Sequence, residues 1–139
     1  ERGFSMKKMT SIEETEEQEI YKENILEQYK HPQNKKELQE YSVKHKEYNP
    51  LCGDEVTVYL NIKNGTVKDV GWTGQGCAIS QAAMSMLSEK IKNMPVTEVK
   101  KITKEDILAL LGIPISYTRM KCAIVSLKVI HAGVEHVRD

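Results

Sequence analysis

The chain has 139 residues, with 20 Lys plus Arg and 20 Asp plus Glu, so its formal net charge is zero. A chain of this length normally forms one globular domain. Nucleic-acid binding draws its affinity from neutralised phosphates, so a balanced chain without a basic block is not expected to bind nucleic acid. No apolar run approaches the ~20 residues that cross a bilayer, and the first residues lack the apolar segment of a secretory signal. We expect a cytoplasmic protein with no membrane partner.

Residues 1–17 are polar and acidic and offer almost nothing to bury. We interpret them as a tag remnant followed by a flexible segment, and we expect the folded domain to occupy residues 18–139. Residues 17–30 show the apolar spacing of an amphipathic helix, with a stripe formed by Ile20, Tyr21, Ile25, Leu26 and Tyr29. Pro32 should end this helix, because the residue before a proline is disfavoured in the α region.

Two strands are expected after residues 31–54, a stretch with few periodic signals that reads as extended or looping. In residues 55–63 polar residues alternate with apolar ones, which is typical of a half-buried strand; the apolar residues are Val56, Val58, Leu60 and Ile62. Asn64-Gly65 is a strong hairpin signal because both positions tolerate positive φ. Residues 66–73 should therefore return as the second strand.

Helices are expected after the break at residues 74–76. Residues 78–92 have helical periodicity, and Thr103 followed by acidic residues resembles the start of a short helix that Gly112 and Pro114 end. The last helix should begin near Ser116 or Thr118. It is expected to turn the following residues toward the core: Met120, Ile124, Leu127, Val129 or Ile130, and Val134. A helix, strands and further helices in one chain predict a single-domain α+β protein.

The three cysteines carry most of the chemical information. An odd number without a secretory signal argues against a disulfide framework. Inert, buried thiols are the ordinary interpretation, but Cys52, Cys77 and Cys122 each lie near the end of an expected element. Cys77 precedes a helix and Cys122 lies near the start of another, beside Arg119 and Lys121, and such settings stabilise a thiolate.

A carboxylate stands close to the first of these cysteines, because Asp54 follows Cys52 by two residues. Three thiolates and one oxygen would complete a tetrahedral zinc shell or hold a small iron–sulfur cluster. The spacing is not that of a CxxC pair. The residue types alone leave zinc and iron–sulfur chemistry both open.

The local contexts of the cysteines resemble a known family, the iron–sulfur cluster assembly scaffolds of the IscU, SufU and NifU N-terminal type. The resemblance covers roughly Glu19 to Val134. It rests on four motifs in order, namely Tyr29-x-x-Pro32-x-Asn34, Asn49-Pro50-x-Cys52-Gly53-Asp54, Gly74-x-Gly76-Cys77-Ala78-Ile79-Ser80 and Arg119-x-Lys121-Cys122.

The resemblance implies a ligand set and a fold. Cys52, Cys77 and Cys122 would ligate a [2Fe–2S] cluster or a zinc ion, with Asp54 as the acidic partner, and Cys52 and Cys122 are the candidate persulfide acceptors. The fold would be a small antiparallel sheet of about three strands packed against helices. The third strand would then fall in residues 40–50.

The chain also departs from the family. The IscU branch usually carries a histidine before the last cysteine, where this chain has Lys121. The proline-containing element that a dedicated Hsp70 chaperone recognises is replaced by Ile115-Ser-Tyr-Thr-Arg119, which argues against docking of that chaperone. The motifs resemble those of SufU, whereas the short segment between Cys77 and Cys122 gives an IscU-like length.

Two functions follow from the resemblance. The first is a non-enzymatic scaffold that receives sulfur from a cysteine desulfurase, binds iron, assembles a labile cluster and passes it to recipient apo iron–sulfur proteins. The alternative is a zinc-dependent sulfur acceptor of the SufU type. A purely structural zinc protein is a third interpretation, against which the ligand positions at element ends argue.

The histidines and a group of lysines are interpreted as surface residues without a role in the cysteine site. The four histidines lie away from the cysteine motifs and are expected at the surface or at element boundaries. Five lysines could form a docking face, although a solvated surface is the ordinary interpretation; they are Lys90, Lys92, Lys100, Lys101 and Lys104.

Overall fold

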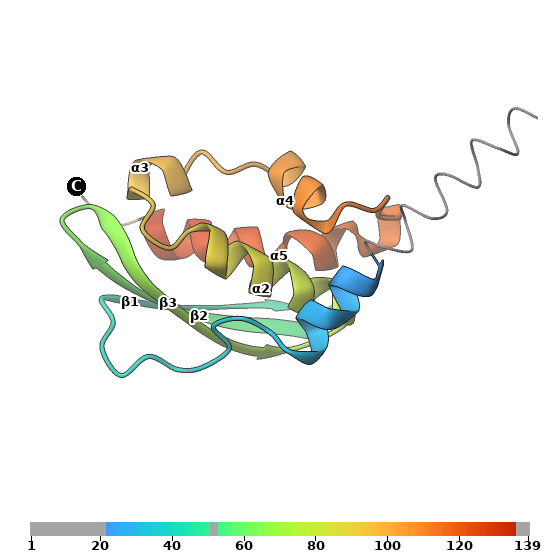
Figure 1. The fold of residues 1–139 in the computed structure, drawn as a ribbon, viewed down its shortest axis with the longest axis horizontal. Helices are drawn as coiled ribbons and strands as arrows, with labels where there is room; N and C mark the ends of the chain where they lie inside the picture. Colours follow the sequence, from blue (N-terminus) through green and yellow to red (C-terminus); the bar gives the residue numbers. More distant parts are fainter. Residues whose placement is uncertain (1–21, 51–52, 136–139) are drawn as a thin grey trace, which may run out of the picture.

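The computed structural model describes residues 22–50 and 53–135 (Figure 1). A helix over residues 22–30 is followed by the strands β1 (Val43–Asn49), β2 (Asp54–Lys63) and β3 (Thr66–Gln75). The helices α2 (Ala78–Lys90), α3 (Val96–Val99), α4 (Lys104–Leu111) and α5 (Tyr117–Glu135) complete the chain order. The expected acidic segment over residues 1–17 lies outside the described residues.

The sheet is antiparallel throughout, with the strand order β1-β2-β3. The expected hairpin is confirmed, because Asn64 and Gly65 connect β2 to β3 with φ values of 54° and 72°. Of the alternating apolar residues of β2, Val56, Val58 and Leu60 are buried on the face that the helices cover, and Ile62 is half-buried near the end of the strand. The expected α+β class with a small three-stranded sheet is therefore correct.

The first strand is the one that periodicity did not reveal. β1 pairs with β2 from Val43 opposite Leu60 to Asn49 opposite Asp54. Its half-buried positions include the polar residues His45 and Glu47, so apolar residues do not alternate with polar ones along this strand. β1 forms an edge of the sheet, where polar side chains on the inner face still reach water. Only the family resemblance pointed to this strand.

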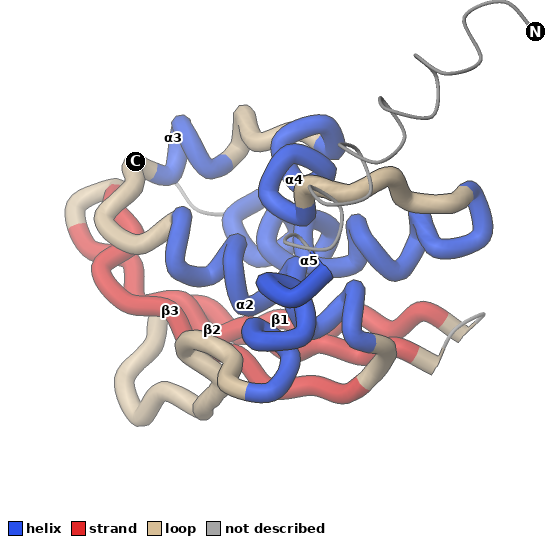
Figure 2. The backbone as a smooth tube through the Cα atoms, turned by 45° about the vertical axis from the view of Figure 1, so that its right-hand side comes forward, coloured by secondary structure: helices blue, strands red, loops and turns tan. Residues whose placement is uncertain are grey.

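Two helices form the layer that covers the inner face of the sheet, with α2 and α5 side by side (Figures 1 and 2). Gly133 lets α5 approach closely, since a Cβ there would lie 3.3 Å from Val43 Cγ1. The largest fully buried apolar side chains come from the sheet, from α2 and α5, and from α4, which packs on these two helices; they include Trp72, Leu60, Met84, Leu87, Ile91, Ile130, Ile107 and Leu111. This core fixes the ends of α2, α5 and β2 relative to one another.

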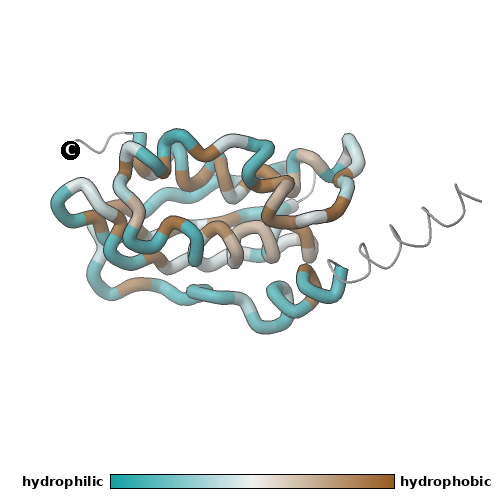
Figure 3. Tube along the Cα trace, turned by 45° about the horizontal axis from the view of Figure 1, so that its top comes forward, coloured by the Kyte–Doolittle hydropathy of each residue, from teal (hydrophilic) through white to brown (hydrophobic). Residues whose placement is uncertain are grey.

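The segment over residues 31–42 crosses the outer face of the sheet and is mostly hydrophilic (Figure 3). It touches the sheet closely at Gly71, where a Cβ would lie 2.5 Å from the carbonyl oxygen of Lys36 and 2.9 Å from Leu38 Cγ. Tyr41 adds an edge-on ring contact to Tyr59, with the ring centroids 5.3 Å apart. Both faces of the sheet are therefore covered, one by helices and one by a single strap of chain.

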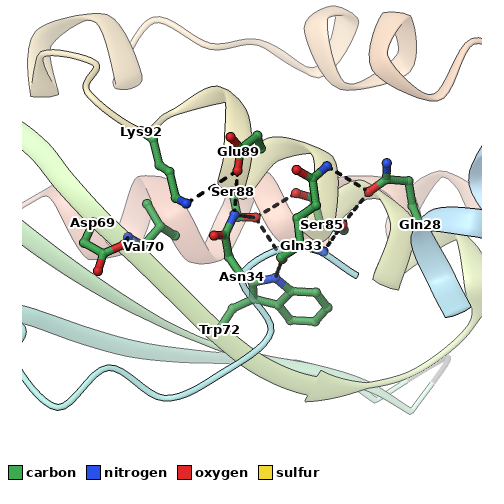
Figure 4. A network of polar contacts seen from close by, with 10 residues as sticks. All are labelled: Gln28, Gln33, Asn34, Asp69, Val70, Trp72, Ser85, Ser88, Glu89 and Lys92. Carbon is green, nitrogen blue, oxygen red and sulfur yellow. Dashed lines mark hydrogen bonds and ion pairs between the residues drawn. The ribbon is translucent and has the colours of Figure 1, made fainter. Parts of the chain in front are cut away.

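A polar clamp fastens the beginning of this strap to α2 and β3 (Figure 4). The Trp72 indole nitrogen donates to the Gln33 carbonyl at 2.8 Å, and the Trp72 backbone N–H donates to the Asn34 carbonyl at 3.0 Å. Asn34, at φ 63°, donates through its amide to Ser88 Oγ at 3.0 Å, and the Gln33 N–H donates to Ser85 Oγ at 2.8 Å. The motif at Tyr29-x-x-Pro32-x-Asn34 thus has a structural role, away from the cysteines.

Two sequence expectations about helix faces are wrong. In the first helix only Ile25 of the expected stripe within the described residues is buried, whereas Leu26 and Tyr29 are 48% and 45% exposed. In α5 the side chains of Ile124 and Leu127 are only half-buried, because the sheet contacts the neighbouring face of the helix. Apolar spacing identified both helices, but the position of the sheet decided which side of each helix is covered.

The short helices α3 and α4 lie on the side of α2 and α5 away from the sheet (Figure 1), and α3 was not expected from the sequence. The start of α4 is as predicted: Thr103 Oγ1 accepts from the Asp106 N–H, and the Asp106 carboxylate accepts from the Thr103 N–H at 2.9 Å. Gly112 ends the helix with φ 73°. Within the described residues, no helix has the length and apolar character needed to cross a bilayer.

Candidate metal centre

Three separate elements bring Asp54, Cys77 and Cys122 to one point. Each residue offers a ligand atom, and these atoms lie within 4.8 Å of one another. Asp54 begins β2, Cys77 is the N-cap of α2, and Cys122 lies in α5. Cys52, the fourth residue expected at this point, lies outside the described residues. The structure therefore brings together three of the four residues singled out from the sequence.

Asp54 is fully buried, although its place beside a turn suggested a surface position. It shares the inner face of β2 with Val56 and Val58, so its carboxylate points toward the helices. Its Oδ1 accepts a hydrogen bond from the backbone N–H of Cys77 at 2.9 Å. Its Oδ2 is also buried and has no hydrogen-bond partner among the residues that the structure describes. A buried carboxylate oxygen without a partner is costly, and a bound cation would offset that cost.

Gly76 makes room for this carboxylate. Its φ is 153°, and a Cβ at this position would lie 2.1 Å from Asp54 Oδ1 and 2.8 Å from Ser80 Oγ. Any larger residue would push the carboxylate away from the Cys77 N–H. The Gly-x-Gly-Cys motif thus has a physical meaning, since its second glycine lets β2 and the start of α2 meet around one carboxylate.

Cys77 directly precedes the first residue of α2, as expected. It has extended backbone angles, with φ −75° and ψ 167°, and its side chain makes no capping hydrogen bond. The Ser80 hydroxyl donates to its carbonyl oxygen at 3.0 Å, which fixes the first turn. The sulfur of Cys77 therefore lies beside the N-terminal, positive end of the α2 dipole, at a partly exposed position.

Cys122 lies deeper in its helix than its sequence context suggested. It is the sixth residue of α5 and is only 1% exposed. The influence of the helix dipole falls off within the first turn, so Cys122 lies beyond the part of α5 where the dipole acts most strongly. Arg119 and Lys121, three residues and one residue before Cys122 in α5, are both exposed. Lys121 cannot act as a ligand while protonated, because an ammonium has no lone pair.

These residues fit a thiophilic metal. Two thiols and one carboxylate oxygen form a donor set that suits zinc, or the iron of a small cluster, better than calcium or magnesium, which prefer all-oxygen shells. A tetrahedral centre built on Asp54, Cys77 and Cys122 lacks one donor. The sequence had identified these donors, but the structural role of Gly76 was missed; its signal was a glycine directly before the cysteine.

Comparison with known proteins places the chain among relatives that have been characterised. The family model for the NifU-like N-terminal domain matches residues 20–139. The zinc-dependent sulfurtransferase SufU of Bacillus subtilis is 30% identical over 132 residues, which cover 83% of this chain and 89% of that protein. The iron–sulfur cluster assembly scaffold protein IscU of Thermotoga maritima is 36% identical over 86 residues, which cover 62% of this chain and 61% of that protein.

A solved structure shows the same fold. The crystal structure of a putative iron–sulfur cluster assembly scaffold protein of the SUF system from Fervidobacterium islandicum matches with a TM-score of 0.72 at 23% sequence identity. The match covers 81% of this chain and 94% of that chain. From the family match over residues 20–139, together with these relatives, we conclude that the chain belongs to the family of NifU-like N-terminal domains.

Proposed function

We propose that this protein is a scaffold for iron–sulfur cluster assembly. The observation that carries the proposal is the convergence of Asp54, Cys77 and Cys122 around a buried carboxylate oxygen without a partner. Such a site is ready for a cation, and its sulfur donors match iron. Cys52, two residues before Asp54 in the chain, would supply the remaining thiolate. The cluster, of the [2Fe–2S] type, is the cargo of the reaction.

Sulfur would arrive as the persulfide of a cysteine desulfurase. A thiolate of the site, on Cys52 or Cys122, attacks the terminal sulfur of that persulfide. A new S–S bond forms on this chain, the S–S bond of the donor breaks, and the donor cysteine leaves as a thiolate. Arg119 and Lys121 stand close to Cys122 in the sequence and would stabilise the negative charge that the attacking sulfur carries.

The donor set also supports release of the cargo. A carboxylate in place of a fourth thiolate gives one weaker and more exchangeable bond than a Cys₄ site would have. Recipient apo iron–sulfur proteins would take the finished cluster from this side. The cytoplasm, where thiols stay reduced, is the compartment that suits such a site.

A second function is favoured by one specific observation. The relative from Bacillus subtilis that matches over 89% of its own length is named a zinc-dependent sulfurtransferase. The same donor set fits zinc, which when bound would hold the thiolates ready and lower their affinity for protons. In that case the chain would accept sulfur from the desulfurase without building a cluster.

One experiment separates these functions. The protein is purified without oxygen, its zinc and iron contents are measured, and it is then supplied with desulfurase, cysteine and ferrous iron. A scaffold gives the visible absorption of a cluster with two irons for each cluster bound. A zinc-dependent acceptor keeps its zinc and accelerates desulfurase turnover with no cluster spectrum.

Matched variants control this experiment. Cys77→Ser and Cys122→Ser should abolish both outcomes. Ser126→Ala should keep them, because Ser126 lies one turn beyond Cys122 in α5, buried but outside the cluster of ligand atoms. Wild-type protein that binds neither metal nor cluster under these conditions would refute both functions.

A further inference from the structure

A groove runs along α5 and β1 and ends beside the candidate metal centre. It consists of two adjoining hollows of about 670 Å³ and about 320 Å³, which share Glu47, Ile124 and Lys128. The larger hollow reaches Lys100 and Lys104 near α4, and the smaller one reaches Pro50 and Lys121 near the candidate site. We call this surface the α5–β1 groove.

The floor of the groove is an apolar side of α5. Ile124, Leu127 and Ala132 line it, and each is only half-buried. They lie on one side of α5 at helical spacing, and no helix or strand of the described residues covers that side completely. β1 borders the groove, and no backbone–backbone hydrogen bond within the described chain caps the outer edge of that strand. An apolar strip beside an open strand edge is suited to binding a segment of another protein.

The rim of the groove is positive, although the whole chain is neutral. Four lysines line it, namely Lys100, Lys104, Lys121 and Lys128, against two glutamates, Glu47 and Glu135. Glu47 is already engaged by His45, whose Nε2 lies 2.7 Å from its carboxylate. Within the described residues, no carboxylate lies within ion-pair distance of Lys104, Lys121 or Lys128. Although the net charge of the chain is zero, the positive charges of Lys104, Lys121 and Lys128 surround this apolar strip without a neutralising carboxylate in the described ranges of the chain.

The wall of the larger hollow also contains a polar atom without a hydrogen-bond partner in the part of the chain that the structure describes. The Nε2 atom of His131 is buried in the wall of the larger hollow and has no hydrogen-bond partner among the described residues. A buried ring nitrogen without a partner is costly unless an arriving group bonds to it. The groove therefore offers an apolar contact, a positive rim and one unsatisfied polar atom.

The position of the groove indicates what it serves. Its near end is lined by Asn49, Pro50 and Lys121, which flank the cysteine-bearing turn and Cys122 in the sequence. A protein bound along the groove would therefore be held next to the candidate metal centre, where sulfur is to be received. Positive charge around the groove would attract acidic segments and speed their association.

We propose that the α5–β1 groove binds an acidic, amphipathic segment of the sulfur-donating protein and so orients the donor cysteine toward the candidate metal centre. This inference rests on the proposed function, under which the donor is a cysteine desulfurase. Glutamates and aspartates of the segment face the lysine rim, and its apolar side chains cover Ile124 and Leu127.

The test compares two double charge reversals of equal size. Lys104→Glu/Lys128→Glu changes the groove, and Lys63→Glu/Lys68→Glu changes two exposed lysines of the β2–β3 hairpin. Glu at position 104 suits the first turn of α4, so the groove variant should fold. The probe is the purified cysteine desulfurase of the same organism, and its association rate is measured from low to physiological salt.

At low salt the groove variant should associate with the desulfurase about tenfold more slowly than wild type, and this difference in association rate should shrink as the salt concentration rises. The association rate of the hairpin variant should stay within about twofold of that of wild type. Leu127→Ser should speed dissociation without this salt dependence. Equal effects of the two double variants, no effect of either, or wild type that binds no desulfurase would overturn the inference. So would sedimentation showing that the groove pairs two copies of this chain. Cluster formation from inorganic sulfide needs no donor, so it tests the proposed function separately.

Discussion

The Asp54 carboxylate has two oxygens with different tasks. Oδ1 accepts the Cys77 N–H and joins β2 to α2, and Oδ2 is buried without a hydrogen-bond partner among the described residues, as an oxygen that could bind a cation would be. A residue beside a turn ordinarily lies at the surface, and its loss would then alter the lifetime of a cluster more than the stability of the fold. Because Asp54 is fully buried, its charge and its hydrogen bond now have to be tested separately.

Asp54→Asn makes this separation. The amide oxygen can still accept the Cys77 N–H, but the buried charge is removed, so the free energy of unfolding of the metal-free protein should stay equal or rise by about 1 kcal/mol. Zinc affinity should fall at least about tenfold, because a weaker donor replaces the carboxylate. Urea unfolding and competition with a chelator measure the two effects. Asp54→Ala, which also loses the hydrogen bond, should be less stable than Asp54→Asn; the reverse order would contradict this role of Oδ1.

Gly76→Ala should disrupt the site in two ways, by backbone strain and by a steric clash with Asp54. The added Cβ would lie 2.1 Å from Asp54 Oδ1, at a φ that L-residues rarely adopt. We expect a loss of about 2 kcal/mol or more in unfolding free energy and a parallel loss of metal retention. Gly112→Ala, at φ 73° in the end of α4, is the control. It should cost about 1 kcal/mol and keep the metal; metal loss in both variants would show that stability alone governs retention.

Lys121→His places an imidazole beside Cys122, as in the IscU branch that the motifs resemble. Unlike an ammonium, a neutral imidazole can donate a lone pair to a metal. We expect slower zinc or iron loss to a chelator and slower transfer of sulfur or cluster. Lys128→His, exposed two turns further along α5, should leave retention unchanged. Equal retention in the wild type and Lys121→His would mean that position 121 does not face the metal.

At the scale of elements, α4 shows how far a local pattern can carry a prediction. Thr103, the acidic first turn and Gly112 marked its start and end, and the structure has the reciprocal hydrogen bonds of a capping box at those positions. Thr103→Ala should cost about 1 kcal/mol of unfolding free energy. Urea unfolding at neutral pH measures it, and Thr103→Ser, which keeps the hydroxyl, should restore most of the loss.

The same cap predicts a pH dependence. The hydrogen bonds from Thr103 hold the pKa of the Asp106 carboxyl below its usual value. A carboxyl whose pKa is lower in the folded state stabilises the fold fully above its unfolded pKa, about 3.9 for Asp. This contribution is lost as the pH falls through the folded pKa. The stability advantage of wild type over Asp106→Asn should therefore be constant near neutral pH and vanish in acid; an advantage that persists in acid would assign the effect to packing.

At the scale of the whole molecule, the candidate metal centre connects β2, α2 and α5, so filling it should stabilise the entire fold. Zinc at about one hundred times its Kd would add about 2.7 kcal/mol to the native state, which corresponds to roughly 10 °C in Tm for a chain of this size. A chelator should reverse the shift. Thermal unfolding of wild type and Cys77→Ser measures it, and a shift of equal size in both would place the bound zinc elsewhere.

The sequence by itself determined the elements whose signals are local. Apolar alternation predicted β2, Asn64-Gly65 predicted the turn and the return of the chain as β3, and the capping residues predicted α4, since each of these signals depends on neighbours along the chain. Cysteines beside glycine and proline, together with the family resemblance, singled out four partners, Cys52, Asp54, Cys77 and Cys122.

Only the tertiary structure decided what depends on contacts between distant segments. β1 has no apolar alternation because it is an edge strand, and the exposed sides of the first helix and of α5 follow from where the sheet lies. Asp54 is buried, and glycine is needed at position 76, because β2 meets the start of α2 there. The two residues are far apart in the sequence, so no local pattern reports their contact. Local sequence reports backbone preference, whereas burial and ligand geometry are set by which surfaces meet.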